Sequence, residues 1–297
     1  GARIRLVALD LDGVVYRGGE VLPGVRDALE EVVRRGLDLR YVSNNSTAHR
    51  ETVSERLAGM GLPAGVERVL TSGFVTGRWL RARLPAGAPV LVVGEAGLIR
   101  ELRDAGLDAR YAGRPLAGQH DLEPADRRGG PPASPPAAVV VGADRSLSFA
   151  AIAAAQTAIM QGAIFVATNL DPTFPTPEGL IPGAGAVVAA VATAAQSEPV
   201  LMGKPSVALA EILAAATGLS SSQTLFVGDR LDTDIAMGRA VGMVTVLVLT
   251  GVTGEDDLRR ARDGAGSAEA GADSPALPDY VLSDLGELQA LLDSLGA

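Results

Sequence analysis

The stretch IRLVALDLDGV, residues 4–14, decides the fold. Its first part, 4–9, is almost entirely apolar, which is typical of a strand buried on both faces of a parallel sheet. Two aspartates, Asp10 and Asp12, follow directly, and Gly13 allows the chain to leave the strand sharply. Since ligands bind outside the carboxyl ends of strands in open parallel sheets, a reactive carboxylate is expected here.

Asp10 and Asp12 point to the same side of an extended backbone because side chains alternate along a strand. At about 4 Å and an effective dielectric near 20, two carboxylates repel each other by roughly 4 kcal/mol. The pair therefore needs a cation or a shared proton, and Mg²⁺ prefers oxygen ligands of this kind. On these residues alone, an ordinary acidic turn after a strand is an equally good interpretation.

The pattern continues along the chain, because apolar runs of strand length alternate with segments of helical period. This alternation predicts an α/β fold with a mostly parallel sheet. The expected strands after the first are 39–42, 69–70, 90–93, 138–141, 164–167, 224–227, 244–249 and 280–282. The expected helices include 25–33, 53–60, 74–84, 150–161, 183–195, 206–217 and 235–240.

The composition excludes several classes of function. The 297 residues include no Cys and only two His, and the net charge is −9. Thiolate nucleophiles and Cys-ligated metals are therefore excluded, and an acidic chain with few aromatics is a poor nucleic-acid binder. No apolar run reaches the roughly 18 residues of a membrane span, and the first residues lack the features of a signal peptide. We expect a cytoplasmic protein without membrane or nucleic-acid partners, with His49 on the surface at a helix start.

Three other segments place reactive side chains at strand ends or helix starts. The sequence SNNS at 43–46 offers hydroxyls and amides for a phosphate, although a plain helix cap is the better explanation of this segment taken alone. GKP at 203–205 presents a lysine that can bind an anion, although most lysines are solvated surface groups. GDRLDTD at 228–234 offers carboxylates to a cation, or simply complements a helix dipole.

In combination these segments are far more specific, and the whole chain resembles the haloacid dehalogenase superfamily of phosphotransferases. The segments DLDGV at 10–14, SNNS, GKP and GD with Asp234 look like that family's four motifs. Segments 140–144, 165–171 and 182–185 look like its type II cap, found in NagD-like enzymes. The resemblance implies a Rossmann-like parallel-sheet core with an inserted α/β cap domain of type IIA.

Motif spacing locates the insertion. Asp10 and Ser43 are about one βα unit apart, whereas the interval from Ser43 to Lys204 is far longer than the core topology needs. We therefore expect a core of 1–83 and 185–297, with the cap domain at 84–184. Two Gly-rich stretches, 113–136 and 255–278, are expected to be loops, the second beginning with a helical turn.

The resemblance also implies roles for the core residues. Asp10 is the expected nucleophile, and Asp12 the acid and base for the leaving group and water. Mg²⁺ is expected at the Asp10 carboxylate, the Asp12 backbone carbonyl and Asp229. Ser43 and Lys204 are expected to bind the phosphoryl oxygens. Members that cleave carbon–halogen bonds lack the second aspartate, so Asp12 favours a phosphatase.

Other residues have expected supporting roles. Asn44 is expected to border the leaving group and bind phosphate, and Asp234 to orient Lys204 or metal-bound water. Gly13 and Asn45 are expected to support the loops that carry these groups. Cap residues expected to select the substrate are Asn169, Asp171 and Phe174.

The sequence indicates the reaction more clearly than it indicates the substrate. The segments at 175–180 and 230–234 look like those of glycerol-phosphate phosphatases, so the resemblance implies glycerol phosphate or phosphoglycolate, small phosphorylated metabolites, as the substrate. A broader phosphatase for sugar phosphates, nucleotides or pyridoxal phosphate is the alternative enzyme. A receiver-like phosphoacceptor or a phosphate-binding protein is the alternative without catalysis. The resemblance is compatible with a homodimer formed through the cap.

Overall fold

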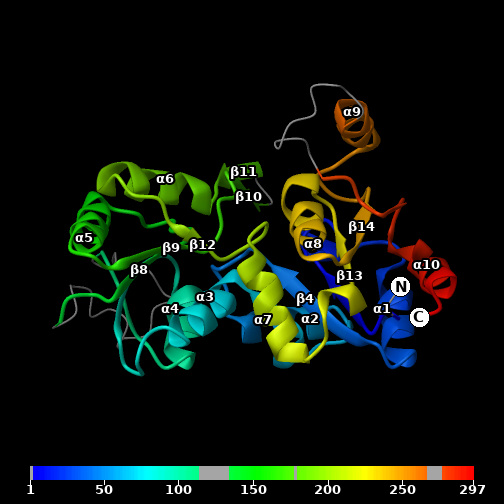
Figure 1. Ribbon diagram of the computed structural model, residues 1–297, viewed down its shortest axis with the longest axis horizontal. Coiled ribbons are helices and arrows are strands. Elements are labelled where there is room, and N and C mark those ends of the chain that lie inside the picture. Colours follow the sequence, from blue (N-terminus) through cyan, green and yellow to red (C-terminus); the bar gives the residue numbers. More distant parts are fainter. Residues whose placement is uncertain (1–2, 114–133, 177–178, 266–275) are drawn as a thin grey trace. The chain divides into compact units, whose positions relative to one another are not determined.

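The computed structural model describes residues 3–113, 134–176, 179–265 and 276–297 (Figure 1). The chain forms two compact units, one of 1–43, 54–70 and 204–297, the other of 44–53 and 71–203. Residues 114–133 and 266–275, which form most of one expected loop and part of the other, lie outside the described residues.

The first unit contains a six-stranded sheet in the order β15-β14-β13-β1-β4-β5. Strand β1 is wholly buried and pairs in parallel with β13 on one side and β4 on the other, with Leu9 opposite Val227 and Tyr41. The carboxyl ends of these three strands therefore lie side by side. The strands are β1 (Leu6–Leu9), β4 (Asp38–Ser43), β5 (Val69–Thr71), β13 (Thr224–Gly228), β14 (Val244–Val248) and β15 (Tyr280–Leu282).

Helices cover this sheet and close its core. Helix α1 packs against β4 and α10, and α8 packs against α7 and β14. The helices are α1 (Val25–Arg34), α2 (Arg50–Gly59), α7 (Val207–Thr217), α8 (Ala236–Val241), α9 (Glu255–Ala265) and α10 (Leu288–Leu295). Helix α9 is longer than the single turn expected there, because Leu258 and Ala261 are buried against Leu231 and Ile235.

The second unit contains a five-stranded sheet in the order β12-β9-β8-β6-β7, all in parallel. Helices α5 and α6 pack together on one face, and α3 and α4 on the other (Figure 1). The strands are β6 (Pro89–Val93), β7 (Asp108–Tyr111), β8 (Ala138–Val141), β9 (Ile164–Ala167) and β12 (Val200–Leu201). The helices are α3 (Ser72–Arg81), α4 (Ala96–Asp104), α5 (Phe149–Met160) and α6 (Ala184–Ala195).

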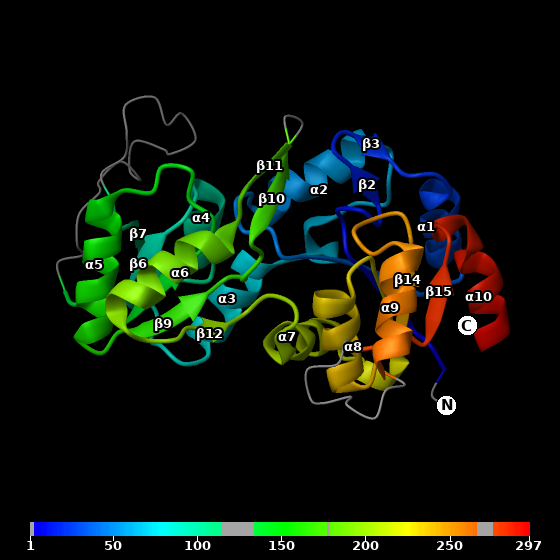
Figure 2. The ribbon, with the colours of Figure 1, turned by 90° about the horizontal axis from the view of Figure 1, so that it is seen from above.

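Two antiparallel hairpins complete the described elements. The first, β2 (Tyr16–Arg17) with β3 (Glu20–Val21), follows the loop after β1. The second, β10 (Thr173–Thr176) with β11 (Gly179–Pro182), projects away from the five-stranded sheet just before α6 begins (Figure 2). Neither hairpin was expected from the sequence.

The α/β fold class with parallel sheets is confirmed, and the two units differ in extent from the expected domains. The second unit takes in α3, α6 and β12, which the expected boundaries assign to the core. Helix α6 belongs there because it packs on α5 and buries Val187, Val188 and Val191 in that unit's apolar core. No helix in the described part of the chain is long and apolar enough to span a membrane.

Candidate active site

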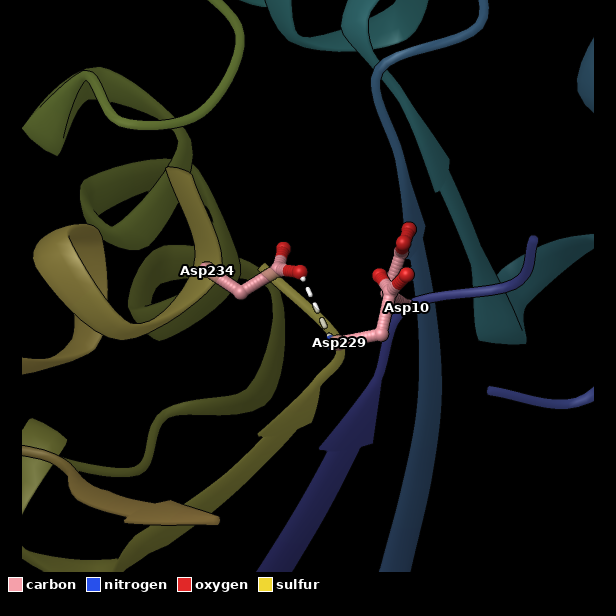
Figure 3. Close-up of side chains that lie close together, drawn as sticks. All are labelled: Asp10, Asp229 and Asp234. Atoms are coloured by element: carbon pink, nitrogen blue, oxygen red, sulfur yellow. Dashed lines mark hydrogen bonds between the residues drawn. The ribbon is translucent and has the colours of Figure 1, made fainter. Parts of the chain in front are cut away.

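Three buried aspartates meet at the carboxyl edge of the first unit's sheet. Asp10 follows β1, and its backbone N–H donates to the carbonyl oxygen of Val227 at 2.9 Å. Asp229 follows β13, the neighbouring strand, and Asp234 lies in the π-helical turn before α8. One carboxylate oxygen from each of these residues lies within 4.8 Å of the others (Figure 3).

Lys204 joins two of these carboxylates. Its Nζ lies 2.6 Å from Oδ1 of Asp10 and 2.7 Å from Oδ1 of Asp234, and the residue is only 3% exposed. Burial alone would lower the pKa of Lys204, but the two carboxylates outweigh it and raise the pKa, which keeps the ammonium charged. The other oxygen of Asp234 accepts the backbone N–H groups of Asp229 and Arg230, each at 3.1 Å.

Asp229 is held tightly but keeps one oxygen without a hydrogen bond. Its Oδ2 accepts the backbone N–H of Val252 at 2.6 Å, while Oδ1 is buried with no hydrogen-bond partner among the described residues. Glycines make this approach possible, since a Cβ on Gly251 would lie 1.9 Å from Oδ2 of Asp229. Gly13, with φ of 83°, would place a Cβ 2.7 Å from the same oxygen.

The charges at this site do not balance, because three buried carboxylates face one ammonium. Burial raises the pKa of Asp229 to about 6, with the charge of Asp234 adding to the effect. Burial likewise raises the pKa of Asp10 well above its usual value, which the charge of Lys204 offsets only in part. An oxygen-preferring divalent cation fits this donor set, because it would supply the missing charge and a partner for the bare oxygen of Asp229.

Asp12 lies in a different environment beside these groups. It forms a β-bridge with Tyr16, and it is only partly buried. Burial raises the pKa of Asp12, while the positive charges of Arg56 and Lys204 act in the opposite direction. Arg56 also stacks on the Tyr16 ring at 4.2 Å from its centre. A carboxyl with a raised pKa can hold a proton for transfer nearer to neutral pH.

The sequence SNNS lies where β4 ends, and its residues are held in different ways. Ser43 is buried at the last position of β4. Nδ2 of Asn44 donates to the Asp171 carboxylate at 3.2 and 3.3 Å. Oδ1 of Asn45 accepts from the backbone N–H and the hydroxyl of Thr47, so its contacts stabilise the turn.

The three expected specificity residues do not share one environment. Asn169 is 5% exposed, and its Nδ2 donates to the carbonyl oxygen of Asn44 at 2.7 Å. Asp171 accepts from the side chain of Asn44. Phe174, in β10, instead lines a cavity of about 400 Å³. Its other apolar lining residues include Leu147, Ile181, Pro182 and Val187.

Sequence reasoning missed two groups of residues around these positions. Arg56 and Tyr16 surround Asp12, and nothing in the spacing along the chain brings them together. Ser72 begins α3 directly after β5, and its hydroxyl donates to the carbonyl oxygen of Asn44 at 2.6 Å. A serine following a short apolar strand was the available signal for Ser72.

Comparisons with known proteins agree with this arrangement. A family model described as haloacid dehalogenase-like hydrolase matches residues 7–108, and a second, described as HAD-hydrolase-like, matches 201–288. Glycerol-3-phosphate phosphatase of Gallus gallus is 36% identical, covering 98% of this chain and 93% of that protein. Dihydroxyacetone phosphatase of Corynebacterium glutamicum is 33% identical, covering 84% of this chain and 83% of that protein.

Solved structures show the same similarity. The p-nitrophenyl phosphatase from Archaeoglobus fulgidus superposes with a TM-score of 0.80 at 31% identity, covering 99% of this chain and all of that one. The glycerol phosphate phosphatase from Mycobacterium tuberculosis, in complex with magnesium, gives a TM-score of 0.77 at 32% identity. That alignment covers 96% of this chain and 76% of the other.

Proposed function

The chain belongs to the haloacid dehalogenase-like hydrolases, and from this we propose that Asp10 is the nucleophile of its phosphatase reaction. The protein is a phosphatase, like its relatives, and Mg²⁺ is its cofactor. The observation that carries the residue assignment is the burial of Asp10 against Lys204 at the carboxyl end of β1. A carboxylate at that edge faces the region where ligands of parallel sheets bind.

The proposed reaction has two steps. A carboxylate oxygen of Asp10 attacks phosphorus in line, so that an aspartyl-phosphate forms as the bond to the leaving oxygen breaks. Asp12 gives its proton to the leaving alkoxide, and in the second step it takes a proton from the attacking water. That water releases inorganic phosphate and restores the carboxylate of Asp10.

The phosphoryl group needs positive partners because charge spreads over its oxygens in the transition state. Lys204 is one of these partners, and its ion pair with Asp234 holds the ammonium in place. Ser43 and Asn44 contribute a hydroxyl and an amide from the end of β4. Asp10, Asp229 and the Asp12 carbonyl would hold Mg²⁺, which when bound neutralises charge on the phosphoryl oxygens.

For the substrate we favour glycerol phosphate or phosphoglycolate. Relatives similar along most of this chain carry the names glycerol-3-phosphate, dihydroxyacetone and phosphoglycolate phosphatase, all for small leaving groups. A broader activity on sugar phosphates, nucleotides or pyridoxal phosphate is the alternative, and a sugar-phosphatase is also among the similar proteins.

The test is Mg²⁺-dependent phosphate release from a panel of these esters at equal concentration. We expect the largest kcat/KM for glycerol 3-phosphate or phosphoglycolate. Equal or greater values for nucleotides or pyridoxal phosphate would overturn the substrate assignment, and no release from any ester would overturn the phosphatase itself.

We also propose that the protein is a cytoplasmic homodimer. The chain contains no Cys, which agrees with a reducing compartment. On the second unit, Phe149 and Met160 of α5 are 87% and 70% exposed, which is apolar area that a second copy would cover. Sedimentation analysis should show a dimer, and a monomer at all concentrations would contradict this.

A further inference from the structure

Residues 44–49, here called the strap, leave the last residue of β4 and lead into α2. The carbonyl oxygen of Asn44 anchors this segment. It accepts one hydrogen bond from Oγ of Ser72 at 2.6 Å and another from Nδ2 of Asn169 at 2.7 Å. One donor at the start of α3 and one in the segment after β9 thus bind the same carbonyl oxygen, directly after the proposed phosphate ligand Ser43.

Both hydrogen-bond donors to the Asn44 carbonyl oxygen are buried, so losing either hydrogen bond is costly. Ser72 is fully buried and Asn169 is 5% exposed. Net contributions of such hydrogen bonds are about 1 kcal/mol each, but a buried group left without its partner costs about 1–3 kcal/mol. The Asn44 peptide therefore has one strongly preferred orientation within the second unit.

The side chain of Asn169 is fully engaged by the protein. While Nδ2 donates to Asn44, Oδ1 accepts the backbone N–H of Asp171 at 3.1 Å. That contact in turn places the Asp171 carboxylate, which receives the side chain of Asn44. Asn169 does not line the cavity that Phe174 lines. The side-chain amide of Asn169 thus holds both residues of the Asn44–Asp171 contact in place.

Other contacts hold the strap independently of any ligand. Oγ of Ser46 lies 3.1 Å from Oγ1 of Thr168. Glycine at position 142 makes room for this contact, because a Cβ on Gly142 would lie 2.8 Å from Oγ of Ser46. Gly97 of α4 packs so closely that its Cβ would lie 2.4 Å from the carbonyl oxygen of Thr47. The strap is thus anchored along its length.

We infer that Asn169 is a positioning residue, which sets the phosphate-binding turn at 43–44 through the Asn44 carbonyl and does not read the leaving group. This inference rests on the proposed function and replaces the expected specificity role of Asn169. Ser72 acts on the same carbonyl oxygen and has the same role. Because the phosphoryl group is common to all substrates, loss of either donor affects every substrate alike.

The test compares Asn169→Ala, Ser72→Ala and their double variant with Phe174→Ala, using glycerol 3-phosphate and p-nitrophenyl phosphate as substrates. We expect each single variant at the Asn44 carbonyl to lower kcat/KM for both esters by the same factor, about 10- to 100-fold. The double variant should lose less than the product of the two factors, because both donors act on one group. Phe174→Ala should change the ratio between the esters.

A second readout separates positioning from a loss of stability. Inorganic phosphate, as the product, should inhibit the folded variants more weakly, with a raised inhibition constant for both Asn169→Ala and Ser72→Ala. Cooperative thermal unfolding of each variant checks that the fold is retained, and Ser72→Ala serves if Asn169→Ala does not fold.

Two results would overturn the inference: a changed ratio between the two esters in Asn169→Ala, or an inhibition constant and kcat/KM equal to those of the wild type. A wild-type enzyme inactive on every ester would instead overturn the proposed function, which keeps the two failures distinct.

Discussion

Asp229 shows how one residue links folding and binding in this protein. Its Oδ1 is buried without a hydrogen-bond partner among the described residues, and burial raises its pKa to about 6. A protein rarely keeps such an oxygen unless an ion or ligand compensates for it. The residue therefore destabilises the metal-free fold and stabilises the metal-bound one.

This reasoning predicts that Asp229→Asn reverses the order of stability between two conditions. With a chelator, the variant should unfold at the same temperature as the wild type or above it, because a buried charge has been removed. With saturating Mg²⁺ the wild type should become the more stable, by about 2.7 kcal/mol at a hundredfold excess over Kd. Thermal unfolding in both conditions measures this, and an equal Mg²⁺ shift in both proteins would contradict the metal assignment.

For single residues, the sequence predicted which side chains come together at the site better than it predicted how buried a side chain is and what it contacts. Residue types and strand ends placed Asp10, Asp229 and Asp234 in one region, and the structure brings them together. His49 shows the limit of this approach, since we expected it on the surface and it is 4% exposed, with Nε2 at 3.0 Å from Asp104 of α4. That partner comes from a helix 55 residues away in sequence, which local pattern cannot reveal.

Among the elements, the edge strand β15 pairs with β14 and is preceded by a carboxylate that binds the start of β14. Oδ2 of Asp279 accepts the backbone N–H of Thr245 at 2.8 Å and its hydroxyl at 2.9 Å, and Arg239 pairs with the other oxygen. Burial would raise the pKa of Asp279, but these hydrogen bonds and the arginine outweigh it and lower the pKa. The ionised form is therefore the one that stabilises the fold.

Asp279→Asn should consequently cost about 1–3 kcal/mol of unfolding free energy at neutral pH. A lowered folded-state pKa stabilises the fold above the unfolded value near 3.9, and that stability is lost as pH falls through the folded pKa. The difference between variant and wild type should therefore stay nearly constant from neutral pH to about pH 4 and shrink as the pH falls further. Urea unfolding across this range measures it, and a difference that is constant with pH would contradict the assigned role.

The strap gives a second test at the level of elements. Gly97→Ala adds a Cβ that would lie 2.4 Å from the Thr47 carbonyl oxygen, so the strap or α4 must shift. We expect lower kcat/KM on every phosphate ester, although no polar group is removed. Gly36→Ala is a poor control because Gly36 has φ of 71°, whereas Gly59→Ala is suitable because a Cβ there meets nothing within 4 Å. Equal activity of the Gly97 and Gly59 variants would contradict the anchoring.

Elements with a long apolar period were predictable, and short ones were not. The helices expected at 150–161 and 183–195 are α5 and α6 within a residue, because their apolar faces persist for several turns. Strands β7 and β12 and both hairpins were missed. These have two to four residues each and depend on pairing with neighbours, so sequence periodicity had too few positions to indicate them.

For the whole molecule, the net charge of −9 says little about what the protein binds. The acidic residues that matter are buried at one edge of the first unit's sheet, where Lys204 and a divalent cation together would balance the charge of the three carboxylates. The division of the chain could be predicted only coarsely. Motif spacing predicts an insertion between Ser43 and Lys204, whereas the association of 44–53, α3 and α6 with the second unit depends on packing between distant segments.

The central claim is that Asp10 is the nucleophile, and Asp10→Asn tests it most directly. Asparagine keeps the size of the side chain, so the fold should persist, as checked by cooperative thermal unfolding. With saturating Mg²⁺ and the best ester from the panel, we predict that kcat falls at least a thousandfold, on the order seen when other enzymes lose their nucleophile. A correctly folded Asp10→Asn protein that hydrolyses the ester within about tenfold of the wild type would contradict the account.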